Sequence, residues 1–128
     1  MGKLLLVACT GVGRYIIEEF MNNRDIGAEL VGIINLNLKQ GINKANYDSY
    51  SDLAVKYNLN IHYCNNINDE ETVKFIEKLV PDVILQSGWS QKFSDKVLQI
   101  PKYGCIGEHP APLPKGRGAA CVNWAILT

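Results

Sequence analysis

A short apolar run near the amino terminus, residues 4–8, constrains the fold more than any other feature of the sequence. The run is apolar without interruption, whereas a strand with one face in solvent alternates apolar and polar side chains. We therefore expect a strand over residues 3–9 that is buried on both faces. The run is too short to cross a membrane, and Cys9-Thr10-Gly11 is a poor cleavage site for a signal peptide.

Short apolar segments alternate with helical patterns along the rest of the chain. The sequence predicts further strands at residues 29–35, 60–63 and 82–85, and a last one near residue 105 that leads to His109. Helices are expected at residues 14–21, 48–57, 69–79, 94–98 and 119–127, with Asn68 as the cap of the third. Residues 36–47 and 86–91 are expected to be loops. This alternation predicts an α/β fold, a Rossmann-like doubly wound and mostly parallel sheet.

Composition narrows the class of protein. The chain has 128 residues, which predicts one domain, and its 13 basic and 13 acidic residues give a net charge of zero. A balanced charge provides no electrostatic footprint for nucleic acid. The four cysteines show no Cys-x-x-Cys pairing, so we expect neither a metal site nor a disulfide framework, and reduced thiols indicate the cytoplasm. The sequence leaves the oligomeric state open, a homodimer included.

Residues 104–118 predict a short strand, a proline-stepped loop and a glycine turn. The three prolines of this segment fix φ and remove backbone donors, so the loop is stiff. His109 is therefore expected at the carboxyl end of a strand, facing a loop that cannot collapse. Because ligands of open α/β sheets bind just outside those strand ends, His109 is a candidate reactive residue.

This segment resembles the signature of the folate-dependent formyltransferases, roughly Asn-x-His-Pro/Gly-Ser-Leu-Leu-Pro-x-x-Arg-Gly followed by a helix. The matching residues are His109, Pro110, Leu113, Pro114, Arg117, Gly118 and Trp124-Ala125-Ile126. The resemblance implies that residues 1–128 form the N-terminal-type catalytic domain of that family. It also implies transfer of a formyl group from 10-formyltetrahydrofolate to a primary amine, a small-molecule substrate.

The resemblance further implies roles for particular residues. His109 would be catalytic, because it assists proton movement from the attacking amine. The folate donor would be bound by Gly88, Trp89, Ser90, Leu113 and Pro114. The Trp89 ring would either face the pterin or pack against the proline-rich loop. The substrate would be bound by Thr10, Gly11, Arg14 and Arg117, unless Arg14 is merely solvated and Arg117 braces the loop.

Two departures from the family pattern bear on mechanism. Gly107 stands where the family has an Asn, whose side-chain amide stabilises the formyl oxygen as that oxygen gains negative charge. The candidates to supply the missing hydrogen-bond donor are Ser87, Ser90, Gln91 or a bound water. The family's Asp, which orients the catalytic His, comes well after it. The chain stops at Thr128, within a predicted helix and before such an Asp, so we expect the domain to be incomplete at its C-terminal end.

Alternative functions stay open at this point. A formyltetrahydrofolate hydrolase would also fit Gly107, and a catalytically silent, folate-binding relative is a second alternative. A nicotinamide-binding module is the third, but Ile16 breaks the G-x-G-x-x-G pattern, and Asn35 and Asn37 stand where a ribose-binding acid is needed. For the transferase, the lack of a basic, tRNA-binding tail favours an amino sugar attached to a nucleotide as the acceptor.

Overall fold

The computed structural model describes residues 2–23 and 25–107, and these contain a five-stranded parallel sheet. The strand order is β3-β2-β1-β4-β5. The strands are β1 (Gly2–Ala8), β2 (Ala28–Leu36), β3 (Ile61–Cys64), β4 (Val83–Ser87) and β5 (Cys105–Gly107). All four neighbouring pairs are parallel, so each connection crosses the sheet through a helical segment.

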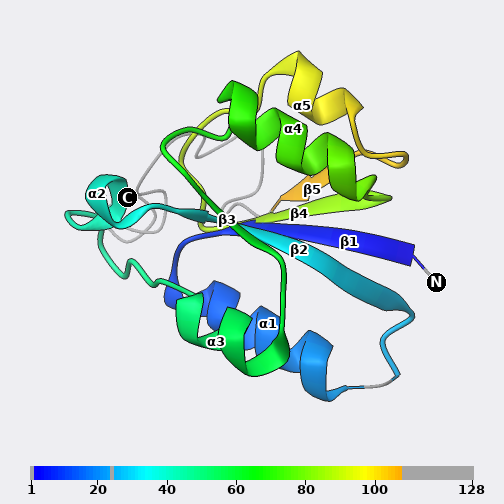
Figure 1. Cartoon of the computed structure of the whole chain (residues 1–128), viewed down its shortest axis with the longest axis horizontal. Coiled ribbons are helices and arrows are strands. Elements are labelled where there is room, and N and C mark those ends of the chain that lie inside the picture. Colours follow the sequence, from blue (N-terminus) through cyan, green and yellow to red (C-terminus); the bar gives the residue numbers. More distant parts are fainter. Residues whose placement is uncertain (1, 24, 108–128) are drawn as a thin grey trace, which may run out of the picture.

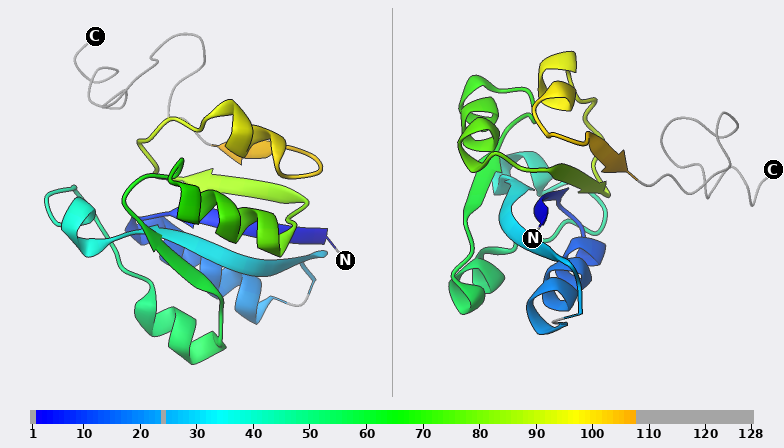
Figure 2. Two further views of the ribbon diagram at one scale, coloured as in Figure 1. Left: turned by 45° about the horizontal axis from the view of Figure 1, so that its top comes forward. Right: turned by 90° about the vertical axis from the view of Figure 1, so that its right-hand side faces the viewer.

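Helices cover both faces of this sheet (Figure 1). They are α1 (Gly11–Asn22), α2 (Leu38–Gly41), α3 (Ser51–Tyr57), α4 (Glu70–Leu79) and α5 (Asp95–Gln99). The end-on view in Figure 2 places α1 and α3 on one face and α4 and α5 on the other. The predicted fold class, a doubly wound parallel α/β sheet, is therefore confirmed.

Local structure differs from the sequence prediction at several places. Helix α1 begins at Gly11, three residues before the predicted start, because the glycine turn is itself helical. A one-turn helix, α2, lies inside the predicted loop 36–47, where the Asn37 side chain accepts a hydrogen bond from Gln40 N at 3.0 Å. One turn is too short to show a helical period. Strand β4 extends to Ser87, so the loop after it begins at Gly88.

The predicted cap of the third helix is wrong. The residue at the N-cap of α4 is Asp69. The side chain of Asn68 instead joins α4 to the segment before α5, because it accepts a hydrogen bond from Ser94 N at 2.8 Å and donates to Lys92 O at 2.9 Å. A long-range partner of this kind leaves no local signal in the sequence. The predicted helix 119–127 lies outside the described residues.

Two apolar layers separate the sheet from its helices. Leu5 and Val7 of β1 belong to the layer beneath α4 and α5, and Leu6 and Ala8 belong to the layer beneath α1 and α3. All four side chains are completely buried. The prediction that the first strand is buried on both faces is confirmed, and β1 is the centre of the fold.

A buried amide fixes the carboxyl end of β1 to its surroundings. Asn35 of β2 is fully buried, and its Nδ2 donates to Ala8 O and to Asp48 O, each at 3.2 Å. Its Oδ1 accepts from Tyr50 N at 3.0 Å. One side chain therefore joins the end of β1, the end of β2 and the segment that enters α3.

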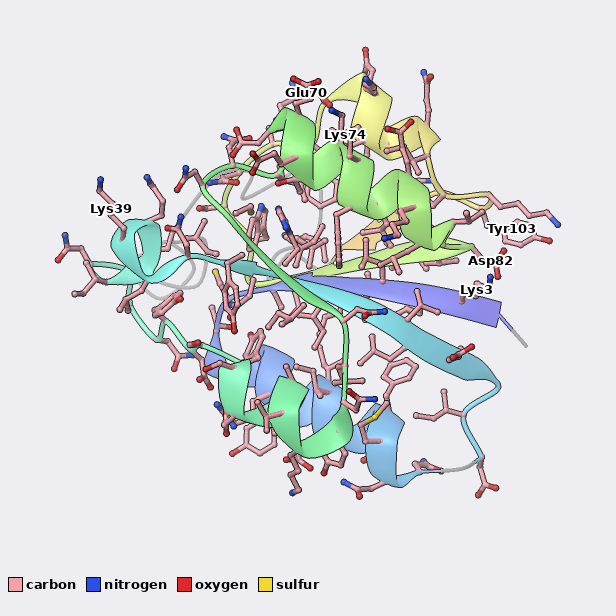
Figure 3. The ribbon with its side chains drawn as sticks, viewed as in Figure 1. Lys3, Lys39, Glu70, Lys74, Asp82 and Tyr103 are labelled. Atoms are coloured by element: carbon pink, nitrogen blue, oxygen red, sulfur yellow. The ribbon has the colours of Figure 1, made fainter. Side chains whose placement is uncertain are left out.

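The opposite, amino-terminal edge of the sheet is closed by bonds to Asp82. In Figure 3, Lys3, Asp82 and Tyr103 lie together at that edge, and Lys39 on α2 projects from the far end of the molecule. The Lys3 amide donates to the Asp82 carboxylate at 2.7 Å, and the Tyr103 amide donates to Asp82 O at 2.8 Å. The carboxyl edge, near α2, is the edge at which a parallel α/β sheet binds ligands.

We expect the Asn35→Ala substitution to lower the free energy of unfolding by about 3 kcal/mol or more. It removes the bonds that Asn35 makes to two carbonyls and one amide of buried or part-buried backbone, and each such group left unpaired costs about 1–3 kcal/mol. Urea unfolding followed by circular dichroism measures the change. Asn43→Ala, at an exposed position of the α2–α3 connection, is the matched control. A loss below about 1 kcal/mol for Asn35→Ala would contradict the role given to this amide.

A histidine on β3 makes stability depend on pH. His62 stacks on Phe75 with ring centroids 5.1 Å apart, and its Nε2 lies 3.1 Å from Thr72 Oγ1. Burial lowers the pKa of His62 from its ordinary value of 6.5, against a smaller opposing effect of Glu71 and Asp69. The folded state therefore prefers the neutral ring more strongly than the unfolded state does.

The free energy of unfolding should accordingly fall as pH drops through 6.5 and level off below the lowered pKa of the folded state. In His62→Gln, which stays neutral, this part of the pH dependence should vanish. Urea unfolding of both proteins at intervals between about pH 8 and pH 5 tests the expectation. The difference between the two curves removes the contribution of His109, the other of the two histidines in the chain. Parallel curves would show that His62 titrates alike in both states.

Candidate functional site

The strand order reverses between β1 and β4, and the carboxyl edge at this point is where sheets of this kind have their ligand-binding crevice. Strand β1 lies between β2 and β4, and the chain leaves β1 and β4 through helical segments on opposite faces. The loops that follow these two strands therefore diverge, and ligands of such sheets bind between them. The predicted site residues Thr10 and Gly11 follow β1, and Gly88, Trp89 and Ser90 follow β4. The fold thus brings both predicted groups to the same crevice.

The two loops are in direct contact at its base. Cys9 Sγ donates to Gly88 O at 3.5 Å, and a Cβ atom at residue 88 would lie 2.7 Å from Thr10 Oγ1. Gly88 has a φ of +63°, which side chains disfavour. The Thr10 carbonyl accepts from the Tyr50 hydroxyl. A glycine at residue 88 is therefore required by its contact with Thr10.

Trp89 is buried rather than displayed on the surface. Its side chain is 7% exposed and belongs to the apolar layer beneath α4 and α5. Its Nε1–H has no hydrogen-bond partner among the described residues, although a buried donor ordinarily has one. The Trp89 carbonyl accepts from Gln86 Nε2 at 2.8 Å. The alternative contact with the proline-rich loop lies outside the described residues.

Lys44 brings a positive charge to the crevice, and no pattern in the sequence indicated this position. Its Nζ donates to Ser90 Oγ at 2.5 Å, so the connection between α2 and α3 reaches the loop after β4. Burial raises the pKa of the Cys9 thiol, and the charge of Lys44 partly opposes this rise. Lys44 lies in a segment without hydrophobic periodicity, so the sequence alone did not indicate a role for it. The strand order brings it beside the loop that follows β4.

Arg14 forms ion pairs within the chain and is not simply solvated. Its Nε and Nη2 lie 2.8 and 2.9 Å from the two oxygens of Asp48, and its Nη1 lies 2.7 Å from Asp52 Oδ2. These carboxylates raise the pKa of Arg14, and the guanidinium lowers the pKa of Asp52. The pairs fasten the first turn of α1 to α3. A contact of Arg14 with substrate stays a prediction, since its charge is already balanced.

Two polar side chains near the crevice are engaged in bonds within the protein. Gln91 was a candidate donor at the reaction centre, but its Oε1 accepts from Ile67 N and its Nε2 donates to Asn65 O, each at 2.8 Å. Its amide therefore holds the segment before α4. Asn35, at the place of a ribose-binding acid, is fully buried and bonded internally, which argues against the nicotinamide alternative. The predicted residues His109, Leu113, Pro114 and Arg117 lie outside the described residues.

The fold defines a doubly wound α/β protein whose strand order reverses between β1 and β4. A family model described as "Formyl transferase" matches residues 10–128, and the chain belongs to this family of formyl-transferring enzymes. The resemblance found in the sequence is thereby confirmed. No helix within residues 2–23 and 25–107 is long and apolar enough to cross a bilayer.

Curated relatives include methionyl-tRNA formyltransferases. The protein of Clostridium tetani is 40% identical over 85 residues, which is 66% of this chain and 27% of the relative. That of Alkaliphilus oremlandii is 32% identical over 105 residues, which is 80% of this chain and 34% of the relative. The chain thus spans only about a quarter to a third of the length of these relatives.

Solved structures show the same fold at low sequence identity. Glycinamide ribonucleotide transformylase 1 of Geobacillus kaustophilus has a TM-score of 0.76 at 15% identity, over 99% of this chain and 68% of that one. A formyltetrahydrofolate deformylase of Pseudomonas putida has a TM-score of 0.65 at 14% identity, over 97% of this chain and 43% of that one.

The contact between the two loops yields a stability prediction. Gly88→Ala should lower the free energy of unfolding by about 3 kcal/mol, from left-handed backbone strain of about 1–2 kcal/mol and a steric clash with Thr10. Gly104→Ala is the matched control, because Gly104 has a φ of +95° and nothing lies within 4 Å of the added Cβ.

The Thr10→Ala substitution removes the two nearest atoms of the clash. In the double variant with Gly88→Ala, about 1 kcal/mol or more should be recovered relative to additive behaviour. Urea unfolding of the unsubstituted chain, the two single variants Gly88→Ala and Thr10→Ala, and the double variant measures this coupling. Equal losses for Gly88→Ala and Gly104→Ala, without coupling to Thr10, would contradict the close packing of these two loops.

Proposed function

We propose that this chain forms the catalytic domain of an enzyme that transfers a formyl group from 10-formyltetrahydrofolate to a primary amine. Membership of the formyl transferase family over residues 10–128 is the observation that carries the proposal. The crevice at the ends of β1 and β4, where the predicted donor-binding and substrate-binding loops meet, supports it.

The crevice has features that suit the folate donor. The Trp89 indole N–H is a buried donor without a partner among the described residues, and a pterin ring carries nitrogen and oxygen acceptors. Gly88, Trp89 and Ser90 would hold the pterin, together with Leu113 and Pro114. Thr10, Gly11 and Arg117 would face the amine substrate, and Arg14 would contribute through the α1–α3 ion pairs that support this loop.

The reaction needs no oxidant or metal. The amine nitrogen attacks the formyl carbon, a C–N bond forms, and the carbonyl electrons move onto the formyl oxygen. The carbonyl then re-forms as the bond to N10 of the folate breaks, and the amine proton ends on N10. His109 would carry that proton. The products are a formamide and tetrahydrofolate.

The choice of acceptor rests on charge. The curated relatives are named for methionyl-tRNA and several solved neighbours for phosphoribosylglycinamide. The net charge of the chain is zero, which provides no overall electrostatic attraction to RNA. We propose a small amine, with an amino sugar on a nucleotide as the first candidate.

The full-length protein should form tetrahydrofolate from 10-formyltetrahydrofolate at a rate that depends on the amine. A panel of an amino-sugar nucleotide, glycinamide ribonucleotide and methionyl-tRNA identifies the acceptor. His109→Ala should reduce kcat by about 10²-fold or more, because it removes the acid–base group. Its circular dichroism spectrum should be unchanged.

The same assay separates the alternatives. Tetrahydrofolate and formate released without any amine would indicate a hydrolase, which Gly107 also fits. Saturable binding of 5-formyltetrahydrofolate with no turnover by the full-length protein would indicate a silent relative. Turnover near the unsubstituted level in His109→Ala would remove this residue from the mechanism.

A further inference from the structure

The side chain of Gln86 fills the space that opens beside Gly107. Gln86 lies on β4 directly opposite Gly107 of β5 in the parallel register. A Cβ atom added to Gly107 would meet Gln86 Oε1 at 2.8 Å. The next nearest atoms to that Cβ also belong to the Gln86 side chain. The Gln86 side chain on β4 therefore occupies the space that a side chain at residue 107 on β5 would need.

Strand geometry places both residues on the same face of the sheet. Ile84 pairs with Cys105 two residues earlier, and both side chains contact the layer beneath α4 and α5. Because side chains alternate along a strand, Gln86 and Gly107 face the same side as this pair. Neighbouring strands are about 4.8 Å apart, a gap that a glutamine side chain crosses. The amide oxygen of Gln86, the atom nearest to the added Cβ, thus occupies the position of a short side chain at residue 107. The Nε2 atom of the same amide is directed toward Trp89 O.

The amide is held in a defined orientation. Gln86 Nε2 donates to Trp89 O at 2.8 Å, so the side chain is fastened to the loop that follows its own strand. A primary amide carries two N–H groups, and this bond uses one of them. Gln86 is half-buried, next to the last residue of the strand before the crevice. It is a neutral donor with fixed geometry at the edge where ligands bind.

We propose that the Gln86 side-chain amide donates a hydrogen bond to the formyl oxygen as that oxygen becomes negatively charged. The inference rests on the proposed formyl transfer and names the residue that supplies the donor missing at Gly107. A fixed neutral donor lowers the barrier because it meets the developing charge without reorganisation. Gln86 was absent from the candidates that the sequence suggested, which were Ser87, Ser90 and Gln91.

The test is steady-state kinetics of Gln86→Ala with the amine that the acceptor panel identifies. The loss of one oxyanion donor typically lowers kcat by about 10²–10³-fold, and we expect this loss with KM for the folate donor little changed. In the double variant Gln86→Ala/Gly107→Asn, residue 107 has room for a side chain, and its φ is not left-handed. The new amide should restore kcat by about tenfold or more relative to Gln86→Ala.

Controls separate a chemical role from a structural one. Gln99→Ala, an exposed glutamine on α5, should match the unsubstituted chain. If Gln86 only positions Trp89, then Gln86→Ala will raise KM for the folate donor and Gly107→Asn will not restore kcat. Either that pattern or a kcat near the unsubstituted value would overturn the inference and leave the proposed function intact.

Absence of turnover in the unsubstituted full-length protein would instead overturn the proposed function. Side-chain amide NMR tests the contact of Gln86 with the formyl group without relying on turnover, with the Gln86 signals assigned from their loss in Gln86→Ala. The probes are 10-formyl-5,8-dideazafolate and 5,8-dideazafolate, which differ only in the formyl group. A shift of the Gln86 signals with the formylated probe alone supports the inference, and equal responses to both probes overturn it.

Discussion

The structure depends on the complete burial of strand β1. Its side chains point alternately into two apolar layers, and all of residues 5–8 are shielded from water. Both faces of the strand must therefore be covered by helices, and the chain can cover both only by reversing its direction of winding. The reversal falls between β1 and β4, and it leaves the ends of these two strands open to a ligand. The position of the crevice is thus a consequence of core packing.

The charged side chains around this crevice bond mainly to other side chains of the protein. The Arg14 guanidinium is balanced by Asp48 and Asp52, and the ammonium of Lys44 donates to the Ser90 hydroxyl. No acidic residue occupies the first turn of α1, although Arg14 in that turn is paired with the Asp48 carboxylate. Apart from the Lys44 ammonium, the groups that remain for a ligand are neutral: backbone groups, the Trp89 indole N–H and the Gln86 amide. This environment suits the transfer of an uncharged formyl group.

The sequence predicted the secondary-structure elements better than the contacts between them. The apolar run of β1 and the amphipathic pattern of α4 are local signals, and both elements formed where they were expected. The contact of Lys44 with Ser90 joins residues 46 positions apart, and that of Gln86 with Gly107 depends on the register of two strands. Neither has a local signature. Arg14 illustrates the same limit. An arginine at this position suggested contact with solvent or substrate, whereas its ion-pair partners, Asp48 and Asp52, come after β2 in the sequence.

The parallel register also has a consequence for how the protein is made. Strand β1 leaves the ribosome first, but its neighbour β4 and the Asp82 carboxylate that its edge binds lie 79 residues later. Chain synthesis at about 5–20 residues per second puts roughly 4–16 s between the two. During that interval this buried strand has only β2 on one side, with its other edge unpaired. The nascent chain is therefore most prone to aggregation, and most dependent on chaperones, before the second half of its sheet emerges.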